Sequence, residues 1–197
     1  MPVLTLASGS GIRRRLLEAA SVPVEIRPAR VDEDALRAAL AAEGASPRDT
    51  ADALAEAKAR KIAARTPGLV LGCDQILAVD RDILAKPTDL PEARAQLARL
   101  SGRRHDLFSA AVIYEDAAPV WRHVGHVRLH MRPLSDTYLD AYLARNWDSV
   151  RDSVGAYKLE EEGARLFSRI DGDYFTVLGL PLLEVLSYLA LRGVIDT

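Results

Sequence analysis

The sequence has little that would place the protein in an oxidising compartment or in a membrane. Among its 197 residues Cys73 is the single cysteine, which excludes an intrachain disulfide and argues against a zinc site built from thiolates. No apolar run approaches the roughly 20 residues that a bilayer-spanning helix needs. The N-terminus shows no charged-then-apolar leader of the secretory kind. We therefore expect a cytoplasmic protein without a membrane partner.

An excess of positive charge is also absent. The chain has 26 Lys and Arg against 28 Asp and Glu, which gives a formal net charge of -2. Such a balance argues against nucleic acid as a partner, because nonspecific binders neutralise phosphates by bulk positive charge. With 49% hydrophobic residues the chain can build a sizeable core. We expect a single domain over residues 1–197, of one body or two lobes.

Strand-like and helix-like segments alternate along the chain, which is typical of a layered α/β fold. Turn residues around Glu115–Pro119 join two of the strands into a hairpin. The patterns predict strands over Val3–Ala7, Val24–Pro28, Leu69–Val79, Asp106–Tyr114, Trp121–Arg132 and Tyr174–Leu178, and helices over Ile12–Ala20, Asp34–Glu43, Ser46–Arg65, Leu90–Leu100, Ser135–Arg145 and Pro181–Arg192.

The segment Val70–Asp80 places an acid inside an otherwise apolar strand. An ionised carboxylate in a strand packed on both faces is costly unless it is paired or bound to a metal, so Asp74 needs either a partner or a function. Lys86 precedes Pro87 a few residues further on, and this rigid turn could return a cation toward the strand. The segment alone fits a buried ion pair or a turn cap as well as a catalytic acid.

The loop Ala7–Gly11 leaves the first strand and enters a helix that begins with Arg13, Arg14 and Arg15. Backbone N–H groups and serine hydroxyls at such a helix start form a ready anion site. Basic residues there oppose the helix dipole, so an anion is expected to compensate them. The alternative is a tight turn followed by solvated arginines, because the loop matches neither the P-loop nor the dinucleotide fingerprint.

Two further features have both a chemical and a structural interpretation. The acidic run Val31–Asp34 could supply oxygen ligands to a hard cation such as magnesium, or it could be a solvated helix start. Lys58 is flanked by small residues that would let its stem lie against the core, and Leu54 at i−4 offers no acid for a surface ion pair. The histidines have no tight metal-ligand spacing.

These residues together resemble the Maf family of nucleoside triphosphate pyrophosphatases over nearly the whole chain. The resemblance implies an inosine-triphosphatase-like α/β domain: a two-lobed α/β/α fold with a central mixed twisted sheet, a deep nucleotide-binding cleft, and a homodimer. The matching pieces, in family order, are Leu4–Ser10 with Arg13, Val31-Asp32-Glu33, Lys58-Ala59, Gly72-Cys73-Asp74, Lys86-Pro87, Leu100-Ser101-Gly102 and Gly179-Leu180-Pro181-Leu182.

The resemblance also implies the reaction and its residues. Such an enzyme hydrolyses a nucleotide to its monophosphate and pyrophosphate with Mg²⁺ or Mn²⁺. Asp74 would be the catalytic carboxylate, as general base or metal ligand, and Glu33 would share the metal. Cationic and hydroxyl groups that would hold the triphosphate are Ser8, Ser10, Arg13, Arg14, Lys58 and Lys86, of which Lys58 and Lys86 would also act in catalysis.

Base choice is suggested by a smaller set of residues. Asp74-Gln75, the Arg13-Arg14 pair and Lys158-Leu159-Glu160 resemble the 7-methyl-GTP subfamily more than the one that prefers dTTP and UTP. A carboxylate such as Glu160 could accept hydrogen bonds from the N1 and N2 hydrogens of guanine. A pyrimidine nucleotide as substrate, and a catalytically silent nucleotide-binding regulator of cell division, are the alternatives.

Overall fold

The structure is a computed structural model that describes residues 4–196, so Val3 of the first predicted strand lies outside the described residues. Its chain divides into two compact units. The first comprises the described parts of Met1–Gln75, Phe108–Gly125 and Gly179–Thr197, and the second comprises Ile76–Leu107 and His126–Leu178. Because β3 (Leu69–Val79), β5 (Arg104–Glu115) and β6 (Ala118–Met131) each run from one unit into the other, the units share strands.

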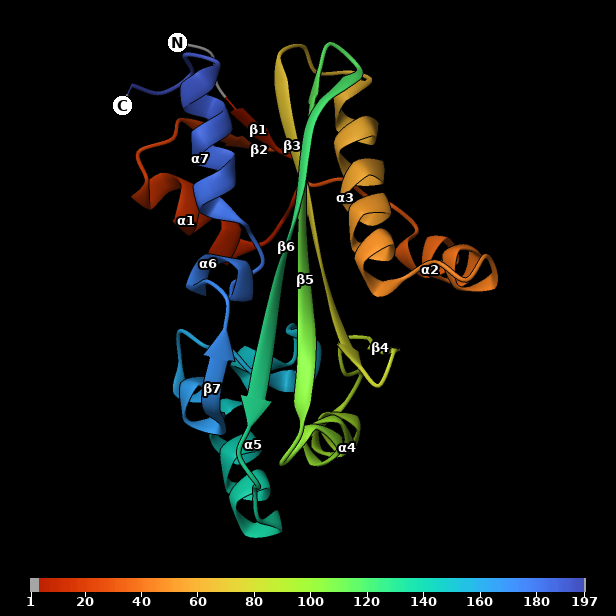
Figure 1. Cartoon of the computed structure of the whole chain (residues 1–197), viewed down its shortest axis with the longest axis vertical. Coiled ribbons are helices and arrows are strands. Elements are labelled where there is room, and N and C mark those ends of the chain that lie inside the picture. The colour runs from red at the N-terminus through yellow and green to blue at the C-terminus, as the bar shows by residue number, and fades with distance from the viewer. Residues whose placement is uncertain (1–3, 197) are drawn as a thin grey trace. The chain divides into compact units, whose positions relative to one another are not determined.

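A mixed seven-stranded sheet confirms the α/β fold class (Figure 1). Its strands follow the order β2-β1-β3-β5-β6-β7, and β4 pairs with β3 off this path. The pairs β1–β2 and β1–β3 are parallel, whereas β3–β4 and β6–β7 are antiparallel. The remaining strands are β1 (Leu4–Leu6), β2 (Val24–Ile26), β4 (Asp82–Leu84) and β7 (Phe167–Asp171).

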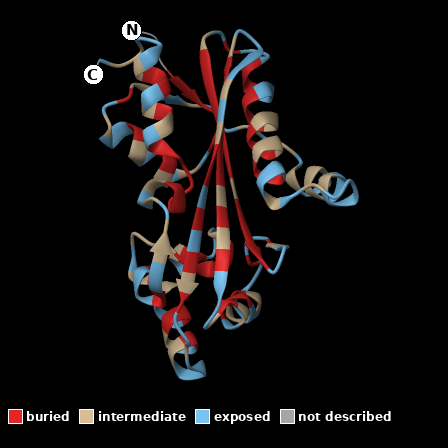
Figure 2. Ribbon diagram, viewed as in Figure 1, coloured by how far each residue is buried: buried red, intermediate tan, exposed pale blue. Residues whose placement is uncertain are grey.

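In the first unit, helices cover both sides of the strands: α1 and α7 lie on one side and α3 on the other (Figure 1). Apolar residues of the strands and of the helix faces turned toward them are buried (Figure 2). This is the layering expected of strands that are apolar on both faces. The helices of this unit are α1 (Gly11–Ala19), α2 (Glu33–Ala42), α3 (Pro47–Ala63) and α7 (Leu182–Leu191).

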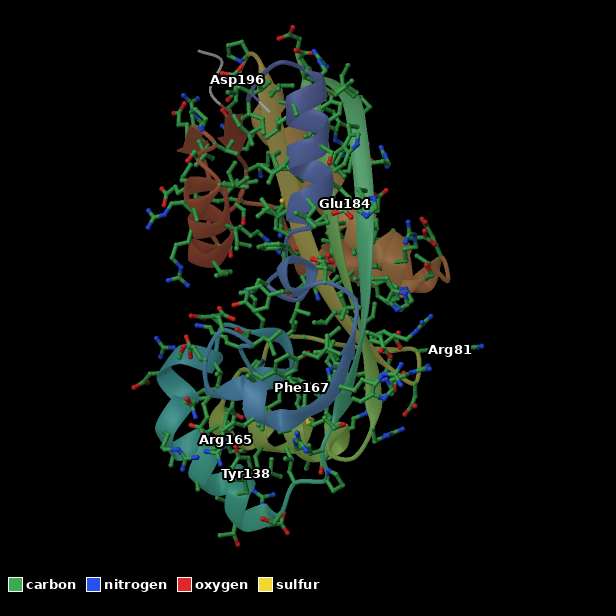
Figure 3. The ribbon with its side chains drawn as sticks, turned by 60° about the vertical axis from the view of Figure 1, so that its left-hand side comes forward. Arg81, Tyr138, Arg165, Phe167, Glu184 and Asp196 are labelled. Carbon is green, nitrogen blue, oxygen red and sulfur yellow. The ribbon has the colours of Figure 1, made fainter. Side chains whose placement is uncertain are left out.

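The second unit has its own apolar core, which includes Leu77, Leu97, Val127 and Leu143. Figure 3 places Phe167 at the start of β7. The guanidinium of Arg165 lies over the ring of Tyr138, with its Cζ 5.7 Å from the ring centroid. The elements of this unit are α4 (Leu90–Leu100), α5 (Asp136–Val150), the short 3₁₀ helices η1 (Val154–Ala156) and η2 (Glu162–Leu166), and α6 (Tyr174–Val177), together with β4, β7 and the shared strands.

The strand predicted over Tyr174–Leu178 is wrong, because Tyr174–Val177 forms the short helix α6. The side chain of Asp173 accepts a hydrogen bond from the backbone N–H of Thr176 at 2.8 Å, which caps the helix start. The sequence prediction also omitted β4 and β7, and it ended α5 too early, at Arg145. No helix among residues 4–196 is both long and apolar enough to cross a bilayer.

His105 is a buried titratable group in the second unit. Its side chain is 0% exposed, its Nε2 lies 2.8 Å from the hydroxyl of Tyr157, and its Nδ1 is buried without a hydrogen-bond partner. Desolvation lowers the pKa of His105 from 6.5 to about 4, against the opposing influence of Asp106. The folded protein therefore holds this imidazole neutral.

This burial predicts a pH-dependent stability. Above pH 6.5 the contribution of His105 is fully present, and it is lost as the pH falls toward 4, because the unfolded chain then binds a proton that the folded chain resists. The loss amounts to about 3 kcal/mol in the free energy of unfolding. Urea unfolding at pH 7.5 and pH 4 should show a smaller pH effect for His105→Gln than for the wild type. The same change at His123, in the first unit, is the control, and an equal pH effect in wild type and His105→Gln would contradict the prediction.

Candidate active site

The first component of the site is Asp74, in the buried central strand β3. The residue is 4% exposed. Its Oδ1 accepts a hydrogen bond of 2.6 Å from the Nζ of Lys58, whereas its Oδ2 is buried without a hydrogen-bond partner. Asp74 is therefore one half of a buried ion pair, one of the possibilities raised by the sequence, and its catalytic role stays a prediction.

Close packing of α3 on β3 brings Lys58 to this position. A Cβ atom built on Gly72 would lie 2.2 Å from the carbonyl oxygen of Ala55 and 2.6 Å from the backbone nitrogen of Ala59. Only glycine fits so close to a helix backbone. Lys58 projects from the buried face of the same helix and is 8% exposed. The surface role that the sequence left open for Lys58 is therefore excluded.

The acidic run at the start of α2 divides into two roles. Asp32 caps the helix, because its Oδ1 accepts a hydrogen bond of 3.0 Å from the backbone N–H of Ala35. Glu33 instead points its Oε1 at the Nζ of Lys58, 2.7 Å away. The ammonium group of Lys58 thus lies between the carboxylates of Glu33 and Asp74.

Arg37 joins this cluster and was missed by the sequence interpretation. Its NH2 nitrogen lies 3.5 Å from Oε2 of Glu33 and 3.9 Å from Oδ2 of Asp74. The i,i+4 spacing from Glu33 was a readable signal, because such residues share one face of a helix. Without knowledge that this face meets β3, the same spacing predicts only a surface ion pair.

The loop before α1 is organised around Arg13. The hydroxyl oxygen of Ser8 accepts hydrogen bonds from the backbone N–H of Ser10 and from NH1 of Arg13, both at 3.2 Å. Arg13 is buried and also donates to the carbonyl oxygens of Gly179, at 2.7 Å, and Cys73, at 3.2 Å. The guanidinium therefore has protein partners, and its predicted contact with an anion stays a prediction.

The neighbours of these residues are placed as follows. Arg14 is exposed and lies 3.7 Å from Glu18. Gln75 donates a hydrogen bond of 3.0 Å to the hydroxyl of Ser109. Burial raises the pKa of the Cys73 thiol to about 11, so this sulfur is protonated at neutral pH and is a poor nucleophile.

Three predicted site residues belong to the second unit. Lys86 follows β4 and is exposed. Lys158 donates a hydrogen bond of 2.8 Å to the hydroxyl of Ser149, and its Nζ lies 3.6 Å from Glu161. Glu160 is half-buried. Their approach to a nucleotide stays a prediction, whereas Ser8, Arg13, Glu33, Lys58 and Asp74 come together within the first unit.

The charges of the central cluster suit a polyphosphate with a divalent cation. Glu33 and Asp74 supply two carboxylates, and Oδ2 of Asp74, which accepts no hydrogen bond, is available to a cation or to a water proton. Among residues 4–196 no three or more Asp, Glu, His or Cys side chains gather as a metal cage. Mg²⁺ is commonly held by one or two carboxylates together with substrate phosphates, so the residues fit such an ion.

Comparison with known proteins identifies the family of this chain. The family model described as "Maf-like protein" matches residues 3–191. A protein of Ruegeria pomeroyi named "Nucleoside triphosphate pyrophosphatase" is 64% identical over 195 residues, which cover 98% of each chain. This chain therefore belongs to the Maf family.

Two further comparisons concern a relative whose name specifies a nucleotide and a solved structure of low similarity. A protein of Rhizobium meliloti named "7-methyl-GTP pyrophosphatase" is 49% identical over 196 residues, which cover 99% of this chain and 98% of that protein. A crystal structure of a nucleoside-triphosphatase, or dITP/XTP pyrophosphatase, from Mycobacterium abscessus covers 76% of this chain and 96% of that chain at 18% identity. Its TM-score of 0.42 is too low to support a conclusion about the site.

Proposed function

We propose that this chain hydrolyses 7-methyl-GTP to 7-methyl-GMP and pyrophosphate. At the coarser level the chain is a nucleoside triphosphate pyrophosphatase, a hydrolase acting on acid anhydrides, and similar proteins of 59–64% identity carry the first of these names. The observation that carries the chemistry is the buried Asp74, whose Oδ2 accepts no hydrogen bond and which lies beside Glu33 and Lys58.

Asp74 is the residue that activates water in this proposal. As water forms a bond to the α-phosphorus, the bond from that phosphorus to the oxygen bridging to the β-phosphate breaks and pyrophosphate leaves. Oδ2 of Asp74 accepts the proton of the water, while Oδ1 stays bonded to Lys58. The alternative to this general-base role is that Asp74 acts only as a ligand of the metal.

Glu33 and Asp74 would hold the divalent cation, Mg²⁺ or Mn²⁺. When bound, the cation supplies charge neutralisation at the phosphate oxygens. The cationic residues stabilise the charge that develops on the departing pyrophosphate, because positive groups fixed in a buried site need no reorganisation. The proposed triphosphate-binding residues are Ser8, Ser10, Arg13, Arg14, Lys58 and Lys86.

Guanine recognition is assigned to Gln75, Lys158 and Glu160. The carboxylate of Glu160 accepts hydrogen bonds from N1–H and N2–H of the base, which a pyrimidine edge does not offer in this arrangement. Support comes from the relative named "7-methyl-GTP pyrophosphatase" at 49% identity.

The proposal also includes a homodimer in the cytoplasm. Size-exclusion chromatography with light scattering would test the dimer by measuring the molar mass of the protein in solution.

Pyrophosphate release with Mg²⁺ from 7-methyl-GTP, GTP, dTTP, UTP and ITP tests the base preference. We expect 7-methyl-GTP to lead. Glu160→Gln should lower the preference for guanine nucleotides by about tenfold, because a bidentate contact to a base edge is worth about 1–3 kcal/mol of discrimination, and it should change the maximal rate less. Glu43→Gln, at the exposed end of α2, is the matched control.

Each other outcome of this panel identifies a different alternative. Release led by dTTP and UTP would replace the 7-methyl-GTP assignment with a pyrimidine nucleotide and keep the enzyme class. An unchanged substrate profile in Glu160→Gln would remove Glu160 from the specificity pocket. Release from none of the nucleotides would favour the nucleotide-binding regulator.

A further inference from the structure

We propose that Arg37 is a positioning residue, which holds Glu33 and Asp74 while no divalent cation is bound and competes with that cation for them. The inference rests on the proposed function, because it takes Glu33 and Asp74 as the metal-binding pair. Arg37 contacts an oxygen of each carboxylate that Lys58 does not use: Oε2 of Glu33 and Oδ2 of Asp74. In each carboxylate one oxygen therefore contacts Lys58 and the other contacts Arg37.

The distances show that Arg37 is the weaker of the two partners. The Nζ of Lys58 lies 2.6 and 2.7 Å from its carboxylate oxygens, whereas NH2 of Arg37 lies 3.5 and 3.9 Å from its own. Good hydrogen bonds from nitrogen to oxygen span 2.7–3.2 Å. The Arg37 side chain is 23% exposed, against 10% for that of Lys58. A cation that enters the pair would thus displace Arg37 before Lys58.

Arg37 is not part of an apolar core, because no residue of helix α2 is fully buried. The Nε of Arg37 is nevertheless enclosed without a hydrogen-bond partner, which is unfavourable for a charged group. The attraction of the two carboxylates offsets that burden, and a guanidinium held mainly by charge can leave when the charge is neutralised.

The charges of the cluster also indicate that Arg37 competes with a divalent cation. Two carboxylates face two cations, so the cluster of Glu33, Asp74, Lys58 and Arg37 is formally neutral. A divalent ion added to that cluster meets the repulsion of both neighbouring cations. Removing the charge of Arg37 should therefore tighten metal binding, a result that no purely structural role for this residue would produce.

The test is a titration with Mn²⁺ alone, in which the free ion is followed by electron paramagnetic resonance. We expect the Kd for Mn²⁺ of Arg37→Gln to fall by at least about threefold at low ionic strength, because the substitution removes a positive charge beside the two carboxylates that repels the ion. In EDTA the same variant should have a lower Tm than the wild type. Arg192→Gln, which removes an arginine paired with Glu115 at 2.8 Å, is the charge-matched control.

The outcomes separate this inference from the proposed function. A wild-type protein that binds no Mn²⁺ would overturn the assignment of Glu33 and Asp74 as metal residues, and the inference with it. Binding by the wild type with an equal or weaker affinity in Arg37→Gln would overturn the role of Arg37 alone. If Arg37→Gln does not fold by circular dichroism, Arg37→Met keeps the side-chain length without the charge and takes its place with the same expectation.

Discussion

Asp74→Asn should reduce the turnover number of pyrophosphate release by about 10² to 10⁴-fold, the usual contribution of a positioned general base. The amide that replaces the carboxylate cannot accept the proton of water, and it offers less negative charge to a divalent cation. The change breaks no hydrogen bond at Oδ2, because this oxygen has no hydrogen-bond partner and its ion-pair contact with Arg37 spans 3.9 Å. Steady-state kinetics with saturating Mg²⁺ and 7-methyl-GTP would measure it.

The fold should survive this substitution. Asparagine keeps the volume of aspartate in a residue that is 4% exposed, and Lys58 retains its contact of 2.7 Å with Glu33, so no cation is left unpaired. Asp34→Asn, in the exposed first turn of α2, makes the same chemical change in the same unit and should leave turnover unchanged. Near-normal turnover in Asp74→Asn with an intact fold would remove Asp74 from the chemistry.

Local patterns in the sequence were sufficient to predict those helices and strands that depend mainly on their own residues. The strand predicted over Leu69–Val79 matches β3 residue for residue, because a long apolar run with branched side chains has few alternatives. The helix predicted from Ser46 begins one residue later, at Pro47, and the side chain of Ser46 caps it by accepting a hydrogen bond from the backbone N–H of Asp49. Asp74 stood out for the same reason, as a charge in an apolar run.

The errors arise where a short-range cap competes with the apolar pattern. Tyr174–Leu178 has aromatic and branched residues that favour a strand. Its first four residues nevertheless form helix α6, whose start is capped by the side chain of Asp173. The protein partners of Arg13 could not be predicted for a different reason. The sequence shows a basic helix start, but the carbonyls of Cys73 and Gly179, which accept from Arg13, come from distant parts of the chain.

The partners of Asp74 could not be read from sequence spacing alone. Lys58 is separated from it by 16 residues and Arg37 by 37, and no periodicity links α2, α3 and β3. What joins them is a tertiary approach that depends on small residues: Ala55 and Ala59 on the helix, and Gly72 on the strand. Small residues at these positions are visible in the sequence, but their meaning is not, because alanine and glycine are common in many settings.

That approach makes Gly72→Ala the second change with a large expected effect. The added Cβ would lie 2.2 Å from a backbone oxygen and 2.6 Å from a backbone nitrogen of α3, and neither atom can move unless the helix moves. Overpacking of this kind destabilises a protein by about 1–3 kcal/mol. Displacement of α3 also carries Lys58 away from Asp74, and misplacing a catalytic group by about 1 Å lowers the rate by roughly 10²-fold.

Calorimetry and pyrophosphate release on the same preparation would measure both effects of Gly72→Ala. Gly11→Ala is the control for stability, because a Cβ there meets no atom within 4 Å, and alanine is favoured over glycine in a helix by about 1 kcal/mol. We expect the Tm to fall for Gly72→Ala and to hold or rise for Gly11→Ala. A Gly72→Ala protein with the Tm and rate of the wild type would mean that α3 can shift without moving Lys58, and the close contact at Gly72 would then not position the catalytic pair.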